Sequence, residues 1–235
     1  MTILTIVQGI VKKLNLNSPS AVIGNTNKEI IQLLNIANEE GDELSRRYRW
    51  QRLMTESTFS SAATESQGAM TTLAGADFGW IANDTIWNRT RNRPMLPVDD
   101  VQWQAMKSAT ITGPFEYFRI RGGNLIVIPT MTASQTCAFE WISKNWCASS
   151  GGTGQEAWTA DSDTGRLDEK IMAQGIMWRF KKYKGLDYAE DFAQYERLVQ
   201  DAMTRDGAKK HTSMGGLAHQ QFLSRNSVSE GNWTL

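Results

Sequence analysis

Apolar residues recur at steps of three and four near both ends of the chain, which places them on one face of an α-helix. The first set comprises Ile3, Ile6, Val7, Ile10 and Leu14. Pro19 and Gly24 interrupt the period. It then resumes with Ile30, Leu33, Leu34, Ala37, Leu44 and Tyr48. Thr26 and Glu29 precede this second set at the spacing of a capping box. The pattern predicts two N-terminal helices, the second ending near Trp50.

The helical period returns after the flexible stretch SSGGTG. One face of the next helix carries Leu167, Ile171, Gly175 and Trp178. Gly185 suits the left-handed residue that ends many helices, and Asp187 with Glu190 has the spacing to cap another. The apolar side of that last helix holds Phe192, Tyr195, Val199 and Ala202, and Gly207 closes it. Because the connection is short, the two helices are expected to lie antiparallel.

The period changes between Gln51 and Ser150, where Gly, Ser, Thr and aromatic residues replace the helical stripe. The stretch FEYFRIRGGNLIVIP predicts a β-hairpin, because two β-rich runs flank paired glycines that reach the positive φ of a tight turn. Phe118 and Ile120 alternate with arginines, as in a strand with one wet face, whereas LIVI is apolar on both sides. A third strand is predicted at TCAFEWIS, where Cys137, Phe139 and Trp141 share a face. PVDDVQWQAMKS predicts a short helix.

Burial then determines the expected architecture. Neither terminal helix pair can cover its own apolar stripe, so we expect the two pairs to pack on each other and the middle of the chain to project. This predicts an α+β fold, a helical bundle of N-terminal and C-terminal helices with a central β-rich insert that contains an antiparallel hairpin. The predicted boundaries are 1–50 and 151–210 for the bundle, 51–150 for the insert and 211–235 for an extended tail.

The charge balance excludes some classes of partner. Lys plus Arg is 25 and Asp plus Glu is 25 among 235 residues, so the net charge is zero. A chain without excess positive charge has no general attraction to a polyanion. No apolar run approaches the roughly 18 residues of a membrane span, and the lysines of the first segment follow its apolar residues, which favours a helix over a signal peptide. We therefore expect a soluble protein.

Residues with obvious chemistry are sparse. Cys137 and Cys147 form no CxxC pair and are expected to be buried free thiols. His211 and His219, the only histidines, lie in the predicted tail, which argues against a histidine triad or a metal centre. The GGTG stretch lacks the lysine of a phosphate loop. The sequence predicts no catalytic residue, no cofactor and no metal.

Several charged pairs have ordinary explanations. Neighbours such as Glu39 and Glu40, or Asp99 and Asp100, point about 100° apart on a helix and cannot face each other across a substrate. Solvation and helix capping are expected to account for these acids. The basic run Arg179, Lys181, Lys182 and Lys184 suits the last turn of its helix, where cations are favoured. A surface that faces DNA is the alternative interpretation of that run.

Nine tryptophans are many for this length. Trp50, Trp141 and Trp178 fit predicted core faces. Four others lie in or beside segments that resemble loops, namely Trp80, Trp87, Trp103 and Trp146. Either loops fold back to bury them or they belong to a large subunit interface, where aromatic residues concentrate.

Several segments in order resemble a family of tailed-bacteriophage structural proteins. They are DTIWNRTRNRP, VQWQAMK, YFRIRGGNLIVIP, FEWISKNW and GIMWRFKKYKGLDYAEDFAQYERLV. The resemblance spans roughly residues 2–207 and is to the head-to-tail adaptor, or head-completion, proteins of the neck, and in arrangement also to gatekeeper-type tail tubular proteins. It implies a homo-oligomeric ring, usually of twelve subunits, that docks below the portal protein, binds a tail or nozzle protein and lets double-stranded DNA pass through its lumen. The implied location is the virion neck, with assembly in the host cytoplasm.

This resemblance assigns two groups of contact residues. The hairpin is expected to be an arm that touches a neighbouring subunit or a tail protein, through Arg119, Arg121, Gly122, Gly123 and Asn124, with Trp80 and Trp87. The tail is expected to reach the portal through Phe222, Leu223, Trp233 and Leu235. Two alternatives stay open, a peptidoglycan-degrading tail enzyme with Glu116 and Glu140 as candidate acids, and a DNA-binding packaging factor.

Overall fold

The computed structural model describes residues 2–109 and 113–207, and the chain divides into two compact units. The helical unit comprises Met1–Met54 and Ile142–Gly207, and the sheet unit includes Thr55–Trp141. Helices and strands are both abundant, so the predicted mixed α+β class is confirmed. The chain leaves the helical unit once and returns to it, and the N-terminal and C-terminal helices therefore belong to the same unit.

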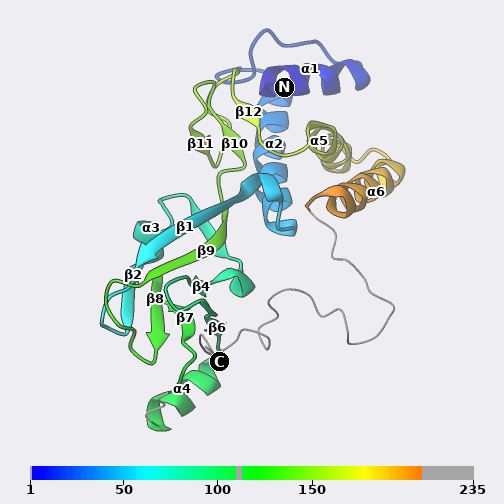
Figure 1. Ribbon diagram of the computed structural model, residues 1–235. Helices are drawn as coiled ribbons and strands as arrows, with labels where there is room; N and C mark the ends of the chain where they lie inside the picture. Colours follow the sequence, from blue (N-terminus) through cyan, green and yellow to red (C-terminus); the bar gives the residue numbers. More distant parts are fainter. Residues whose placement is uncertain (1, 110–112, 208–235) are drawn as a thin grey trace. The chain divides into compact units, whose positions relative to one another are not determined.

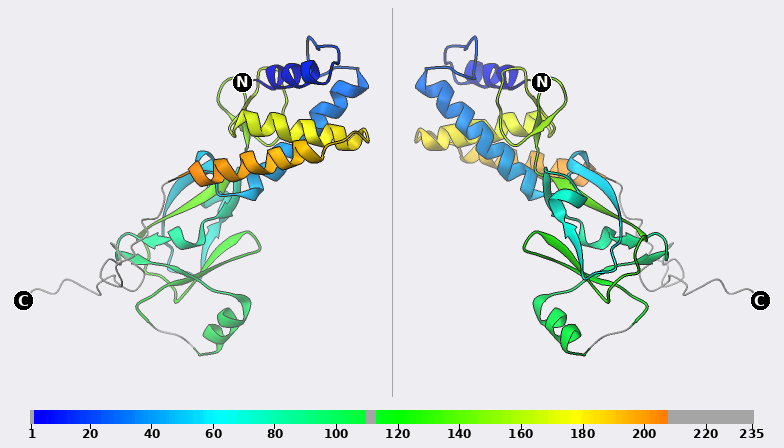
Figure 2. Two further views of the ribbon diagram at one scale, coloured as in Figure 1. Left: turned by 90° about the vertical axis from the view of Figure 1, so that its right-hand side faces the viewer. Right: turned by 90° about the vertical axis from the view of Figure 1, so that its left-hand side faces the viewer.

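Helix α5 is at the centre of the helical unit, because it contacts α1, α2 and α6 (Figures 1 and 2). Residues on all sides of α5 are consequently buried, from Ile171 to Phe180 with the exception of half-buried Ala173. A small antiparallel sheet in the order β11-β10-β12 completes the unit. Its elements are α1 (Ile3–Lys13), α2 (Lys28–Arg47), a 3-10 turn (Gln51–Leu53), β10 (Cys147–Ala148), β11 (Gly154–Gln155), β12 (Thr164–Gly165), α5 (Glu169–Tyr183) and α6 (Ala189–Arg205).

Two predicted helix caps are wrong by one position. Helix α2 is capped by Asn27, whose side chain accepts from the Glu29 N–H over 2.9 Å, instead of by Thr26. Asparagine is among the strongest N-cap residues, and here it lies directly before the first helical residue. Helix α2 ends at Arg47 because Tyr48 is extended, with φ −150° and ψ 160°.

At the start of α6, Tyr188 occupies the cap position and makes no side-chain cap bond. The side chain of Asp187, one residue before the cap position, accepts a hydrogen bond from the Ala189 N–H over 3.2 Å. The predicted pairing of Asp187 with Glu190 as a cap is therefore wrong. The carboxylates of the first turn are Glu190 and Asp191, and they complement the positive end of the helix dipole.

Among its described residues, the sheet unit contains two sheets and two short α-helices. One sheet has the order β2-β8-β7-β6, and the other has the order β1-β9-β4-β5 with β3 also paired to β9. The elements are β1 (Met54–Ser60), β2 (Ser66–Ala69), α3 (Met70–Leu73), β3 (Phe78–Ile81), a 3-10 turn (Asn83–Thr85), β4 (Trp87–Asn88), β5 (Arg93–Pro94), β6 (Leu96–Pro97), α4 (Asp100–Ala109), β7 (Tyr117–Arg121), β8 (Asn124–Ile128) and β9 (Thr136–Ser143).

The predicted hairpin is present as β7 and β8. Its antiparallel register pairs Phe118 with Val127 and Arg121 with Asn124. Gly122 and Gly123 form the turn with φ of +57° and +76°, values that suit a residue without a Cβ. Both strands also have outer neighbours, since β8 pairs with β2 and β7 with β6. The hairpin is thus the middle of a sheet rather than a free ribbon.

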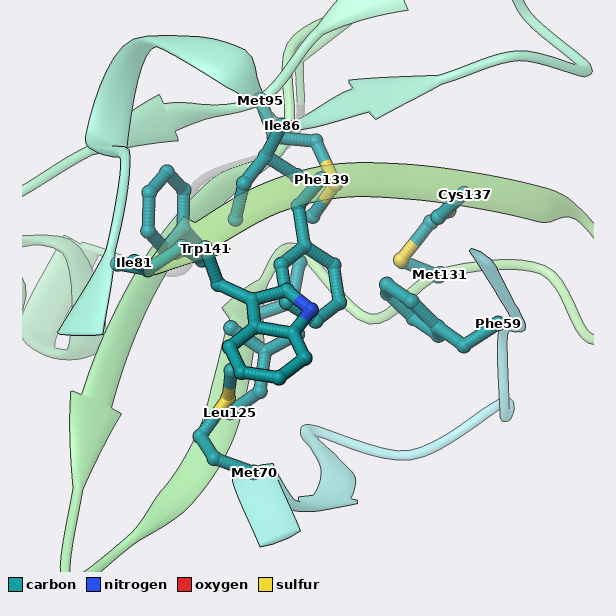
Figure 3. Close-up of a cluster of buried hydrophobic side chains, with 12 residues drawn as sticks. Phe59, Met70, Ile81, Ile86, Met95, Leu125, Met131, Cys137, Phe139 and Trp141 are labelled. Carbon is teal, nitrogen blue, oxygen red and sulfur yellow. The ribbon is translucent and has the colours of Figure 1, made fainter. Parts of the chain in front are cut away.

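The predicted third strand is β9, and it belongs to the other sheet. Its alternating residues Cys137, Phe139 and Trp141 face one buried apolar cluster, as predicted (Figure 3). Leu125 and Val127 of the hairpin enter the same cluster, so β8 of the first sheet and β9 of the second share one core. Burying aromatic and branched side chains from two sheets against each other is the main source of stability for such a layer.

The predicted short helix is α4, which covers a smaller apolar cluster. Trp103 is fully buried and packs with Ile126 and Ile128 of β8. These are the side chains that alternate with Leu125 and Val127, so both faces of β8 are covered. The prediction that LIVI is buried on both sides is confirmed.

Candidate functional site

Large apolar side chains are exposed where α5 turns into α6. Tyr183, Leu186, Tyr188 and Phe192 have exposed fractions of 54%, 53%, 38% and 40%. We call these four residues the α5–α6 corner. A group of exposed apolar side chains is costly in water and is typical of a surface that binds another protein. Aromatic side chains contribute strongly to such contacts, because they bury much area with little loss of side-chain entropy.

Trp178 of α5 packs against two aromatic rings of the corner. Its ring centroid lies 5.0 Å from that of Phe192, in edge-to-face geometry at 67°, and 6.3 Å from that of Tyr188. Trp178 is itself buried and also contacts Tyr195, at 6.0 Å. The exposed rings therefore rest on an ordered aromatic layer, which favours a preformed surface.

The end of α5 fixes the course of the chain into the corner. Gly185 has φ +71°, and its N–H donates to the Lys182 carbonyl over 3.1 Å. The N–H of Leu186 donates to the Lys181 carbonyl over 2.9 Å. These two bonds form a Schellman motif, which requires a left-handed residue at the position of the glycine. The predicted helix end at Gly185 is therefore confirmed, and it sets the position of Leu186.

A second apolar feature of the helical unit is a groove of about 490 Å³ between α1, α5 and α6. Small residues leave room for it, since Gly9 of α1 has no side chain and Ala173 of α5 ends at its Cβ. A Cβ added at Gly9 would meet nothing within 4 Å. The groove is lined by Thr5, Ile6, Gly9, Ile10, Lys13, Glu169, Lys170, Ala173, Gln174, Gln194 and Leu198.

Buried charges lie between α2, α5 and α6. The Nε atom of Arg179 donates to Glu40 over 2.8 Å, and its two terminal nitrogens donate to Glu39 over 3.2 Å and to Glu43 over 2.6 Å. Glu40 is fully buried, whereas Glu39 and Glu43 are exposed. Tyr195 of α6 lies against the same carboxyl group and is also buried. We call these five residues the Glu40 cluster.

The Glu40 cluster overturns two expectations from the sequence. Arg179 is 6% exposed, so it is not a solvated last-turn cation and cannot face DNA. Solvation does not account for Glu40 either. Although Glu39 and Glu40 point apart on α2, the planar guanidinium carries donors on three nitrogens and reaches both carboxylates. The feature of the sequence that indicates this buried ion pair is Gly175, in the middle of α5.

Gly175 leaves the space that Glu40 occupies. A Cβ built at Gly175 would lie 2.2 Å from Glu40 Cδ and 2.3 Å from Oε1. Gly41, the next residue of α2, has the same role for an aromatic ring, because its Cβ would lie 2.5 Å from the Trp146 ring. Two glycines inside helices therefore mark close contacts, which offset their poor helix propensity.

Burial raises the pKa of Glu40 from 4.5 to about 7, and the hydrogen bond and charge of Arg179 oppose only part of this rise. Burial also raises the pKa of Tyr195, with a further contribution from the charge of Glu40. For Arg179, burial acts to lower the pKa, but the bonds to Glu40 and Glu43 leave it above its ordinary value. The guanidinium is thus permanently charged, and Glu40 titrates near neutrality.

The hairpin residues assigned as a contact arm have different surroundings. Arg121, Gly122, Gly123 and Asn124 are exposed, and Gly123 contributes its carbonyl to the Met70 N–H over 2.8 Å. Arg119 is instead paired with Asp100 of α4 at 2.7 Å and is half-buried. Only the turn is therefore open to another chain, and whether it contacts one stays a prediction.

The two candidate acids of the enzyme alternative are Glu116 and Glu140. Glu116 is 2% exposed and takes part in a polar network, in which Asn88 donates to it over 3.3 Å and Arg91 pairs with it at 3.2 Å. Glu140 is half-buried on β9. A carboxyl enclosed in this way is not presented to a glycan in a cleft. Glu116 therefore has a structural role in this unit.

The tryptophans divide between core and surface. Trp103 and Trp146 are fully buried within the chain, in the sheet unit and the helical unit respectively. Trp80 and Trp87 are half-buried. For the first two, folding back of the chain is the correct alternative, and only Trp80 and Trp87 keep exposed surface for a contact. Both predicted free thiols, Cys137 and Cys147, are buried and unpaired, as expected.

The predicted portal-binding residues Phe222, Leu223, Trp233 and Leu235 lie outside the described residues, as do both histidines. Within residues 2–109 and 113–207, no three His, Cys, Asp or Glu side chains are grouped so that they could hold a metal ion. In the same part of the chain, no helix combines the length and the apolar character needed to cross a bilayer.

Comparison with known proteins gives no assignment, because neither the models of protein families nor the curated protein sequences contain a match to this chain.

Proposed function

We propose that the chain is a structural subunit of a bacteriophage neck ring, the head-to-tail adaptor below the portal protein. In this role the N-terminal and C-terminal helices act as one bundle, and the sheet unit is an insert whose hairpin contacts a neighbouring subunit or a tail protein. The tail from His211 reaches the portal. The ring has twelve subunits, and double-stranded DNA passes through its lumen.

The α5–α6 corner is the observation that carries the proposal. Ring contacts are heterologous, so each subunit needs two different surfaces that fit each other. The helical unit has two apolar features of opposite shape, the protruding corner and the groove of α1, α5 and α6. We assign the corner of one subunit to the groove of the next. Leu186, which projects directly after the Schellman turn, is the residue that enters the groove.

Two properties of the sequence support the same role. The aromatic segments that resemble neck adaptors span both units of the chain. The net charge is zero, which suits a conduit, because a strongly basic lumen would bind DNA tightly and hinder its passage.

Electron microscopy of the purified chain, alone and mixed with a portal protein, tests the proposal. Rings in either sample are the expected result. The variant Leu186→Asp should abolish them, because it places a charge in an apolar contact. Val101→Asp is the matched control, since Val101 is the exposed apolar residue of α4 in the sheet unit, with 78% exposure. Clearing of peptidoglycan, or salt-dependent binding of duplex DNA by chains that form no ring, would replace this proposal with one of the two alternatives.

Cysteine crosslinking tests the assigned contact directly. The double variant Gly9→Cys with Leu186→Cys places one thiol in the groove and one in the corner, and oxidation should give a ladder of covalent oligomers. The native thiols do not interfere, because both are buried. The combination Gly9→Cys with Val101→Cys should give no ladder. Rings that resist crosslinking would keep the ring assignment and reject this contact.

A further inference from the structure

The Glu40 cluster holds more negative charge than its cation can offset. Three carboxylates, from Glu39, Glu40 and Glu43, share the single guanidinium of Arg179. With all three ionised, the four groups carry a net charge of about −2, from three carboxylates of −1 and one guanidinium of +1. Glu39 and Glu43 can be solvated, but Glu40 has no exposed surface. Ionisation of the buried member is therefore the most costly of the three, although Arg179 pairs with it directly over 2.8 Å.

Other charged groups around the cluster are already paired. On α2, Arg47 forms an ion pair with Glu196 of α6, and its guanidinium lies 5.7 Å from the Tyr195 ring. On α5, Tyr183 donates to Glu39, and Lys181 pairs with Asp191 of α6. Among the residues that the structure describes, none of these side chains forms an ion pair with Glu40, which leaves Arg179 as its cation.

Two buried oxygens belong to the cluster, one on α2 and one on α6. Glu40 Oε1 and Tyr195 Oη are both enclosed, and neither makes a hydrogen bond of standard geometry within the described part of the chain. Tyr195 nevertheless acts on Glu40, because its phenol lowers the pKa of that carboxyl, but burial raises the same pKa more strongly. A proton on Oε1 neutralises the buried carboxyl, changes the net charge of the four groups from about −2 to about −1 and provides a donor for the phenol oxygen, while Oε2 keeps the bond to Arg179. Loss of that proton favours entry of water, which requires α6 to move away.

We propose that Glu40 is a proton-controlled latch, whose neutral form holds α6 against α2 and α5 and whose ionised form loosens α6. The latch is a property of the helical unit alone, so it does not depend on ring formation. Since α6 carries Phe192 of the α5–α6 corner, proton loss also frees one end of that surface.

The direction of the pH effect follows from the raised pKa. The folded-state pKa of Glu40 is about 7 and its ordinary value is 4.5. Its contribution to the closed state is therefore complete below about pH 4.5 and is lost as the pH rises through 7. Between pH 5.5 and 8, linkage predicts an increase on the order of tenfold to thirtyfold in the opening equilibrium of α6.

Hydrogen exchange of the α6 amides tests the latch in the full chain, with rates corrected for the intrinsic effect of pH. Protection in the wild type should fall on the order of tenfold to thirtyfold from pH 5.5 to 8. Glu40→Gln should be equally protected at both pH values, since its amide resembles the neutral carboxyl. Glu39→Gln, which changes an exposed carboxylate on the same guanidinium, should keep the pH response. A wild type without the response, or a Glu40→Gln variant that retains it, overturns the proposal.

A second measurement is needed if Glu40→Gln does not fold. Carbon-13 NMR of the wild type, with labelled glutamate carboxyl groups, should show one carboxyl that titrates near pH 7. Titration of every glutamate below about pH 5.5 would overturn the latch without any variant.

Discussion

Each unit of this protein buries a glutamate beside an arginine, and the two pairs have different surroundings. In the helical unit, Arg179 is almost fully enclosed and is shared by three carboxylates. In the sheet unit, Glu116 is equally buried, but the Arg91 side chain is 39% exposed. Arg91 also donates to the neutral hydroxyl of Thr132 over 3.1 Å.

The difference shows that the groups around a buried ion pair decide whether its charge can be solvated. Asn88 and Gln135, which lie 2.8 Å apart, supply neutral amides beside Glu116. In the helical unit, the other groups bonded to Arg179 are two further carboxylates, Glu39 and Glu43. Because Arg91 reaches water, the sheet unit can solvate part of its charge, whereas the helical unit can relieve its charge only by taking up a proton or by opening.

Removal of each arginine should give the largest contrast. We expect Arg179→Met to destabilise the helical unit by about 3–5 kcal/mol at pH 8, because Glu40 loses its cation. The loss should shrink at pH 5.5, where Glu40 is neutral. Arg91→Met should cost the sheet unit only about 1–3 kcal/mol, since Glu116 keeps Asn88. Urea titrations followed by hydrogen exchange of each unit measure both, and equal losses would remove the contrast.

Glycine substitution tests whether space for Glu40 is as important as its charge. Gly175→Ala should destabilise the helical unit by about 3 kcal/mol, because the new methyl would overlap the Glu40 carboxyl. Gly9→Ala in α1 is the matched control, with open space around the Cβ. It should be neutral or stabilising by about 0.5–1 kcal/mol, since alanine favours helix. A neutral Gly175→Ala would show that Glu40 can move elsewhere.

The two cysteines report on the two units separately. Burial raises the pKa of Cys137 in the sheet unit and that of Cys147 in the helical unit, each to about 12. Both thiols should therefore react with an alkylating reagent at pH 8 at least about a hundredfold more slowly than in urea. If the helical unit opens more often as the pH rises, Cys147 should lose protection before Cys137, and mass spectrometry of labelled peptides distinguishes them. Faster labelling of Cys137 would contradict this order.

Exposed ion pairs should show the smallest effect and no difference between the units. Arg46 pairs with Asp42 in the helical unit, and Arg89 pairs with Glu56 in the sheet unit. All four side chains are about half exposed or more, so Arg46→Ala and Arg89→Ala should each change stability by less than about 1 kcal/mol. Thermal unfolding at low and high salt measures these variants. A loss above 2 kcal/mol in one unit would show that surface charge also separates the two.

Local patterns in the sequence were sufficient to predict five of the six α-helices that the structure describes, and the strands β7, β8 and β9, but none of the other described strands. The period of Ile3, Ile6 and Ile10 predicts α1 correctly, and the glycine pair between two β-rich runs predicts the hairpin with its turn. Gly185 predicts the end of α5. These features depend on residues a few positions apart, so the chain determines them before any tertiary contact forms. Cap positions shifted by one residue, because Asn27 competes with Thr26 for the same function.

Tertiary structure alone decided which charges are buried and which sheet each strand joins. The helical period places Glu40, and not Glu39, on the apolar face of α2 between Ala37 and Leu44, but it does not show which cation pairs with it. Arg179 belongs to a run of cations that is typical of a solvated helix end. Their pairing depends on the packing of α2 against α5, over a separation of 139 residues, and on the missing side chain of Gly175. Likewise, the strand of Phe139 pairs outside the hairpin sheet. The free energies of burying a charge and of pairing a strand depend on the packing of the whole unit, so a local sequence pattern cannot specify them.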